Sequence, residues 1–74
     1  MKVNEDLILQ ALWAKSTMLG KKFLNIKNDN IYYVTNITID TETLELRVVY
    51  SDWFSINEWD RPITMFMNKF KECN

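Results

Sequence analysis

The segment from Trp59 to Phe66 constrains the fold of this 74-residue chain more than any other stretch. Pro62 lies at its centre, and proline is favoured at the first position of a helix, because the N–H group that it lacks would have no partner there. The apolar residues from Pro62 onward have the i, i+3, i+4, i+7 spacing of a helix with one buried face. They are Ile63, Phe66, Met67 and Phe70. The sequence therefore predicts a short C-terminal helix over residues 62–71.

Four residues of this segment are expected to have structural roles: Trp59, Arg61, Pro62 and Phe66. The indole of Trp59 offers a large surface to bury, and the guanidinium of Arg61 can donate to backbone carbonyls at the end of a strand or helix. Contact of Trp59 and Arg61 with a ligand is the alternative. Asp60 is a candidate to cap the helix that follows.

A second helix is predicted over residues 4–19. Asn4 is a capping residue, two acids follow it at the positive end of the helix dipole, and Gly20 ends the helix. One broad arc of the helical wheel is apolar and is expected to be buried; it contains Leu7, Ile8, Ala11, Leu12, Ala14, Met18 and Leu19.

Leu9 and Trp13 do not belong to that arc. They lie about 200° and 240° around the wheel from Leu7, one helical turn apart from each other. An exposed pair of this kind is expected to be covered. Two coverings are open: the C-terminal helix of the same chain, through Phe66 or Phe70, or another molecule, which is a second copy in a homodimer or a partner protein.

Residues 21–60 are predicted to form the β-rich body. Strands are expected over residues 21–27, 31–40 and 44–50, with a left-handed turn at residues 28–30, a loop over residues 51–58 and a short strand near Trp59. A β-bulge near Thr35 and Asn36 would allow Val34 and Ile37 to face the same core. The predicted fold class is α+β. It is a single domain, residues 1–74, in which a small curved antiparallel sheet resembling an SH3-like barrel carries the two helices.

Several stretches resemble, in order and spacing, a family of small uncharacterised bacterial and phage proteins that is classed as a domain of unknown function. They are Asn30-Ile31-Tyr32-Tyr33-Val34, Glu42-Thr43, Val48-Val49-Tyr50 and Trp59-x-Arg61-Pro62-x-x-Met65-Phe66. The resemblance covers roughly residues 21–70 and implies a small β-barrel-like fold without an established activity. The helix over residues 4–19 lies outside it and is the first place to look for a function specific to this chain.

The composition argues against an enzyme. The chain has no histidine, one cysteine at position 73 and one glycine, so it lacks the usual general base, a thiolate metal site and a glycine-rich phosphate loop. We therefore predict no catalytic residue, no metal site and no cofactor. The absence of an apolar stretch of about 20 residues predicts no membrane span, and a cytoplasmic location in a bacterium or a phage-infected host is expected.

The sequence favours a non-catalytic protein-binding module, with a phage-encoded modulator of a host protein as one form of it. The candidate partner-binding residues are Trp53 and Phe54 in the predicted loop, and Leu9 and Trp13 on the first helix. The alternative is a small nucleic-acid-binding protein, in which phosphate contacts and base stacking would come from Lys21, Lys22, Lys27 and Tyr33. The net charge of −1 gives this alternative no general electrostatic support.

Overall fold

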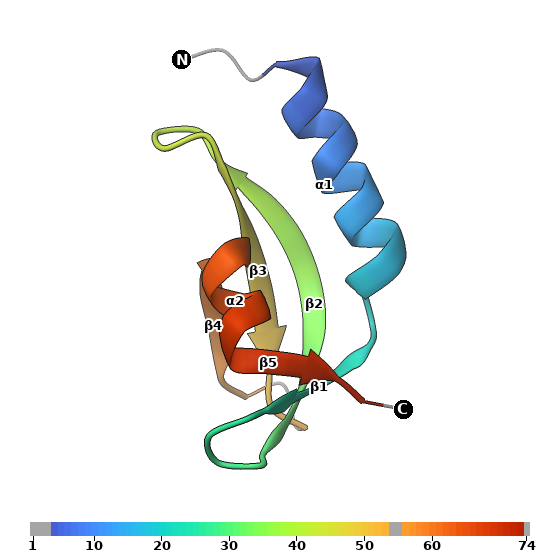
Figure 1. Ribbon diagram of the computed structural model, residues 1–74, viewed down its shortest axis with the longest axis vertical. Coiled ribbons are helices and arrows are strands. Elements are labelled where there is room, and N and C mark those ends of the chain that lie inside the picture. The colour runs from blue at the N-terminus through green and yellow to red at the C-terminus, as the bar shows by residue number, and fades with distance from the viewer. Residues whose placement is uncertain (1–3, 54–55, 74) are drawn as a thin grey trace.

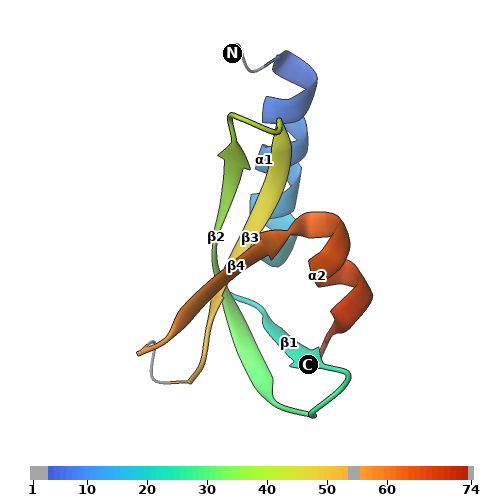
Figure 2. The same cartoon turned by 90° about the vertical axis from the view of Figure 1, so that its left-hand side faces the viewer.

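The computed structural model describes residues 4–53 and 56–73, which form an α+β fold (Figure 1). The elements in chain order are α1 (Glu5–Met18), β1 (Lys22–Asn25), β2 (Ile31–Asp40), β3 (Glu45–Ser51), β4 (Glu58–Pro62), α2 (Ile63–Lys69) and β5 (Phe70–Glu72). The strands pair antiparallel in the order β4-β3-β2-β1-β5. Strand β1 thus lies between β2 and the last strand, and α2 connects the two edge strands. This arrangement confirms the predicted curved antiparallel sheet with two helices (Figure 2).

Helix α1 begins as predicted. The side-chain oxygen of Asn4 accepts a hydrogen bond of 2.8 Å from the N–H of Leu7, which satisfies one of the open donors of the first turn. After the helix, Gly20 adopts φ = 78°, a left-handed conformation that glycine adopts without steric cost. Neither α1 nor α2 is long and apolar enough to cross a membrane, and these are the helices of the described residues.

The buried face of α1 is narrower than the predicted arc. Ala11, Ala14 and Met18 are buried and Leu7 packs beside them, so the helix contacts the sheet along a single stripe. The small alanine side chains on this stripe allow the helix backbone to lie close to the sheet. The prediction is wrong for the rest of the arc, because Ile8, Leu12 and Leu19 are exposed.

The predicted bulge is confirmed. The β2–β3 register shifts between Val34 and Asn36, and Asn36 Oδ1 accepts a 2.9 Å hydrogen bond from the N–H of Ile37. Val34 and Ile37 are consequently both buried, although residues three positions apart in a regular strand point to opposite faces. The left-handed turn before β2 is also confirmed, with Asp29 at φ = 60°.

The centre of the core is a cluster of aromatic rings. Phe66 is fully buried, and its ring centroid lies 4.4 Å from that of Phe70, 5.1 Å from that of Phe23 and 5.2 Å from that of Tyr50. The inner faces of the sheet strands and the buried stripe of α1 complete the same core. The structural role predicted for Phe66 is therefore that of a central core residue.

The C-terminal helix is shorter than predicted. Helix α2 ends at Lys69, and Phe70 begins β5, which pairs with the free side of β1. The apolar spacing over residues 62–71 could not show where the helix ends, because a strand residue at position 70 can bury its ring in the core as a helical residue can. Pro62 is the last residue of β4 and the N-cap of α2, and no side chain caps this helix. Asp60 instead accepts a 2.6 Å hydrogen bond from Arg47 Nε.

The β2–β3 turn contains a carboxylate that is sensitive to acid. Asp40 Oδ1 accepts hydrogen bonds from the backbone N–H groups of Glu42, at 2.9 Å, and Thr43, at 3.3 Å. These bonds favour the ionised form and lower the pKa of the Asp40 carboxyl below its usual value. A depressed folded-state pKa contributes stability that is present above the unfolded-state pKa and is lost as the pH falls through the folded-state pKa.

We therefore expect Asp40→Asn to be less stable than the wild type near neutral pH and to lose less stability on acidification. Thermal melts of both proteins at a series of pH values from about 7 to about 2 measure this, because the difference between them should narrow as the pH falls below the unfolded-state pKa. Equal losses of melting temperature in the two proteins would show that the turn carboxylate does not contribute to the acid sensitivity.

Candidate functional site

The outer side of helix α1 carries the largest exposed apolar surface on one element. Ile8, Leu9, Leu12 and Trp13 are 43%, 63%, 56% and 65% exposed. We call these four residues the α1 surface. In Figure 1, α1 lies along one side of the sheet and the opposite side of the helix is open. The alternative in which the C-terminal helix covers Leu9 and Trp13 through Phe66 or Phe70 is wrong, because Leu9 and Trp13 are mostly exposed and both phenylalanines are buried in the core.

An apolar groove adjoins this surface. Its volume is about 490 Å³. Trp13, Thr17, Met18, Phe23, Ile63, Met67, Phe70, Lys71 and Glu72 line it, and we call it the α1–α2 groove. Trp13 belongs to both features, so the groove and the α1 surface form one continuous apolar region. The sequence did not predict that Ile63 and Met67 line this groove together with Trp13. The spacing of residues within α2 carries no information about which part of α1 lies nearby.

Trp53, the other predicted anchor, lies on a different part of the molecule. It is 70% exposed, and its ring centroid is 5.7 Å from that of Tyr33. Asp52 organises the turn beside it by accepting hydrogen bonds from the N–H of Ile56 and from Asn57 Nδ2. A cavity of about 410 Å³ opens there, lined by Asn30, Ile31, Tyr32, Asp52, Trp53 and Trp59. Phe54, predicted together with Trp53, lies outside the described residues.

Trp59 is less buried than the sequence predicted. It is 41% exposed, and its ring stacks on Tyr50 at 5.8 Å and meets the edge of Tyr32 at 5.5 Å. The expectation of a buried indole is therefore wrong. Strand β4 is an edge strand, so its side chains have neighbours on one flank only.

The lysines of the nucleic-acid alternative do not form one face. Lys21 pairs with Glu72 at 3.7 Å, and Lys22 lies opposite Tyr33 in the β1–β2 register. Lys27 lies in the turn between β1 and β2, at a separate pocket. The three lysines are close in sequence, which suggested a common face. Lys21 and Lys22 are consecutive residues that point to opposite sides of the extended chain, and Lys27 lies beyond β1 in the turn.

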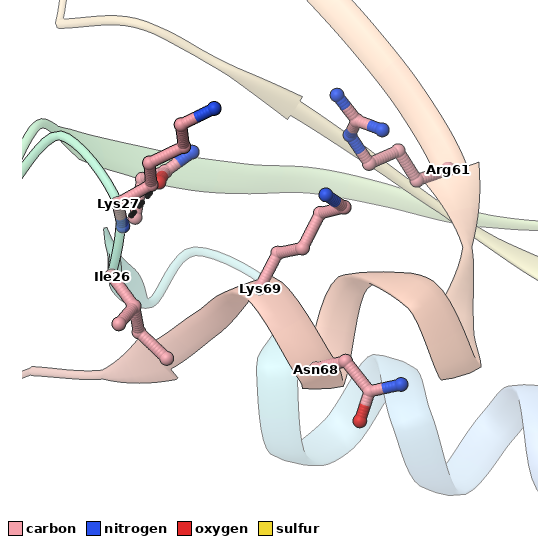
Figure 3. Close-up of a pocket in the computed structure, with 6 residues that line it drawn as sticks. Ile26, Lys27, Arg61, Asn68 and Lys69 are labelled. Carbon is pink, nitrogen blue, oxygen red and sulfur yellow. Dashed lines mark hydrogen bonds between the residues drawn. The ribbon is translucent and has the colours of Figure 1, made fainter.

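This separate pocket brings together three cations from distant parts of the sequence (Figure 3). Its volume is about 380 Å³, and Asn25, Ile26, Lys27, Arg61, Asn68 and Lys69 line it. We call it the basic pocket. Lys69 did not stand out in the sequence, because it adjoins Lys27 and Arg61 only after β4, α2 and the β1–β2 turn have packed.

Among the described residues, Arg61 donates to side chains and not to backbone carbonyls, which corrects the sequence-based expectation. Its Nε donates to the hydroxyl of Tyr50 at 2.8 Å, and its Nη1 lies 3.4 Å from the sulfur of Met65. The Val48–Arg61 and Tyr50–Trp59 register pairs place Arg61 and Trp59 on the inner side of the sheet. Tyr50 therefore supports both residues, one through its hydroxyl and the other through its ring.

Comparison with known proteins concerns mainly the sheet and α2. A family model described as a protein of unknown function (DUF1653) matches residues 27–73, which extend from the β1–β2 turn to the end of β5. Searches of curated proteins and of solved structures gave no match. Helix α1 lies outside the matched range, whereas all three cations of the basic pocket lie inside it. Because the match covers more than half of the chain, this protein belongs to the DUF1653 family of proteins of unknown function.

Proposed function

We propose that this protein is a non-catalytic protein-binding module whose partner binds the α1 surface and the α1–α2 groove. The observation that carries the proposal is the exposure of four large apolar side chains on a 14-residue helix. Together they form an apolar patch on the order of 400 Å², the size of the largest apolar patch on a typical monomer, which is often functional.

The fold itself does not need these side chains. The stripe containing Ala11, Ala14 and Met18 attaches α1 to the sheet, and polar residues at Leu9 or Trp13 would leave that contact intact. Exposed apolar groups favour association, since burying them in an interface releases hydrating water. Their presence on the outer side is therefore explained better by a partner than by the stability of the monomer.

The arrangement also matches the usual anatomy of a protein interface. A standard interface buries about 800 Å² on each partner, with an apolar centre and a polar rim. The α1 surface would supply the centre, and the exposed side chains of Glu5, Asp6, Gln10 and Ser16 would supply part of the rim. The α1–α2 groove beside Trp13 offers a site in which an apolar side chain of the partner can insert.

A second candidate function is the binding of single-stranded nucleic acid by the outer side of the sheet. The favouring observation is the Tyr33–Trp53 ring pair, with Lys22 opposite Tyr33 in the register. Stacked bases and one phosphate contact fit this arrangement. The net charge of −1 and the pairing of Lys21 with Glu72 weaken it, and we rank it below protein binding.

Two tryptophan variants test the proposal. Trp13→Ser and Trp53→Ser remove rings of similar exposure from the two candidate surfaces, 65% and 70% exposed. We expect Trp13→Ser to melt within a few degrees of the wild type, because surface substitutions usually change stability little. It should weaken partner binding by about 30-fold or more, which corresponds to the loss of a hot-spot residue of about 2 kcal/mol. Trp53→Ser should bind the partner as the wild type does.

The measurements are light scattering of the purified proteins and affinity capture from a lysate of the source organism, with and without nuclease. A wild-type dimer that Trp13→Ser converts to a monomer identifies the partner as a second copy. If Trp13→Ser keeps the oligomeric state and every captured protein, the proposal is wrong. Captured material that disappears with nuclease and with Trp53→Ser establishes the nucleic-acid function instead.

A further inference from the structure

The basic pocket is assembled from three separate parts of the chain. Arg61 extends from β4, Lys69 from the end of α2 and Lys27 from the β1–β2 turn. Figure 3 shows the three cationic side chains directed toward a common space, whereas Ile26 and Asn68 point away from it. The N–H of Ile26 donates to the carbonyl oxygen of Lys69 at 3.0 Å, so the turn is attached to the end of the helix.

The three cations lack acidic partners within the part of the chain that the structure describes. Residues 4–53 and 56–73 contain three ion pairs, and none of them includes Lys27, Arg61 or Lys69. By contrast, Arg47, which is half-buried like Arg61, contacts the carboxylates of Glu45 and Asp60. No acidic side chain of the described residues lines the basic pocket. Three like charges that face one space repel one another, and an anion from outside the chain would relieve that repulsion.

Arg61 is held in an orientation suited to an anion. The Tyr50 hydroxyl accepts from Nε and fixes the plane of the guanidinium, and Tyr50 is itself buried in the core. Nη2 and part of Nη1 remain as donors, because arginine has five N–H groups in a fixed fork. A pre-oriented guanidinium loses less side-chain entropy on binding than a free one does.

We propose that the basic pocket binds the phosphoryl group of a small molecule. Guanidinium groups bind phosphate oxygens through paired hydrogen bonds, and lysine ammonium groups supply further point charges for a dianion. The pocket volume of about 380 Å³ accommodates a phosphoryl group together with part of the molecule that carries it. This site shares no residue with the α1 surface or the α1–α2 groove, so it does not depend on the proposed protein-binding function.

The test is an NMR titration of the ¹⁵N-labelled full chain with inorganic pyrophosphate. We expect saturable shifts of the backbone resonances of Lys27, Arg61 and Lys69 and weaker binding at higher salt. The double variant Lys27→Gln/Lys69→Gln should bind at least about 10-fold more weakly, since one hydrogen bond to a charged group is already worth roughly that factor. Both lysines are exposed, so this variant is expected to fold.

A matched control removes the same charge elsewhere. Lys15→Gln/Lys71→Gln replaces two exposed lysines that do not line the basic pocket, and its pyrophosphate affinity should stay within about twofold of the wild type if the pocket is the site. Equal weakening in the two double variants would show that pyrophosphate responds only to net charge. That result, or shifts distributed over all lysines, overturns the proposal.

Tyr50→Phe tests the orientation of Arg61 without removing a charge. Tyr50 is a positioning residue, so the loss of its hydroxyl should weaken pyrophosphate binding by about 3- to 10-fold, the range for one typical intramolecular hydrogen bond. The combined variant Tyr50→Phe/Lys27→Gln/Lys69→Gln should then lose less affinity than the product of the two separate fold-losses, because residues of one site couple. If the two fold-losses multiply without any coupling, Tyr50 does not act through the basic pocket.

Two further ligands define the chemical class. Malonate carries two carboxylates, and a short oligothymidylate carries backbone phosphates on a polymer. Pyrophosphate should bind more tightly than both, with the pocket resonances responding most. Equal or tighter binding of malonate overturns the phosphoryl assignment, and tighter binding of the oligonucleotide at the same resonances overturns the small-molecule assignment.

Discussion

Replacing Phe66 by alanine is expected to lower the free energy of unfolding by about 3–5 kcal/mol, the usual range for removing a buried phenylalanine ring. Phe66 is fully buried and contacts the rings of Phe23, Tyr50 and Phe70, which come from β1, β3 and β5. Its removal leaves a cavity where α2 and the sheet meet. Because the total free energy of unfolding of a small domain is only about 5–15 kcal/mol, this substitution would remove much of the stability.

Urea denaturation followed by circular dichroism measures this effect, with the adjacent Met67→Ala as the matched control. Met67 is 55% exposed on the same helix, and we expect its truncation to cost less than about 1 kcal/mol. Similar midpoints for Phe66→Ala and Met67→Ala would contradict the position of Phe66 in the core. A larger loss for Met67→Ala would place the other side of α2 against the sheet.

Replacing Ala14 by glutamate is expected to cost about 3–5 kcal/mol, the usual penalty for a buried charge without a partner. Ala14 is fully buried on the stripe that attaches α1 to the sheet. A glutamate there must either lose its hydration or move the helix away from β2 and β3. The first outcome costs the free energy of desolvation, and the second loses the contact between α1 and the sheet.

Leu12→Glu is the matched control, because it introduces the same side chain two residues away on the α1 surface. Leu12 is exposed, so this variant should unfold within about 0.5 kcal/mol of the wild type. It should nevertheless weaken partner binding, since the charge lies at the centre of the proposed interface. Equal destabilisation by Ala14→Glu and Leu12→Glu would show that the predicted broad arc, rather than the narrow stripe, faces the sheet.

Local chemistry was sufficient to predict both helices and the strands β1 to β4, but not the end of α2 or the strand β5. Asn4 accepts from a first-turn N–H group, and Asp29 adopts the left-handed conformation expected of the β1–β2 turn. The alternation over β2 and β3 predicted both their pairing and the bulge before Asn36. These features depend on residues close in sequence, whose hydrogen bonds and backbone preferences act before any long-range contact forms.

The wheel of α1 was less informative, because it identifies apolar residues but not which of them the sheet reaches. Two apolar stripes were available, and packing of α1 against β2 and β3 buries Ala11 and Ala14 and leaves Leu12 and Trp13 exposed. Phe70 is a comparable case. Phe70 follows Phe66 by four positions, as a residue on the same helix face would, but it pairs with β1 and is therefore a strand residue.

The sequence by itself predicted the fold class and the order of the elements from α1 to α2. Only the tertiary structure decided which side of α1 is open, that Trp59 is half-covered on an edge strand, and that Lys27, Arg61 and Lys69 surround one pocket. The physical reason is the separation in sequence of the residues that interact. Helix caps, turns and strand alternation depend on neighbouring residues, whereas burial and the convergence of charges depend on segments that meet only when the whole sheet has formed.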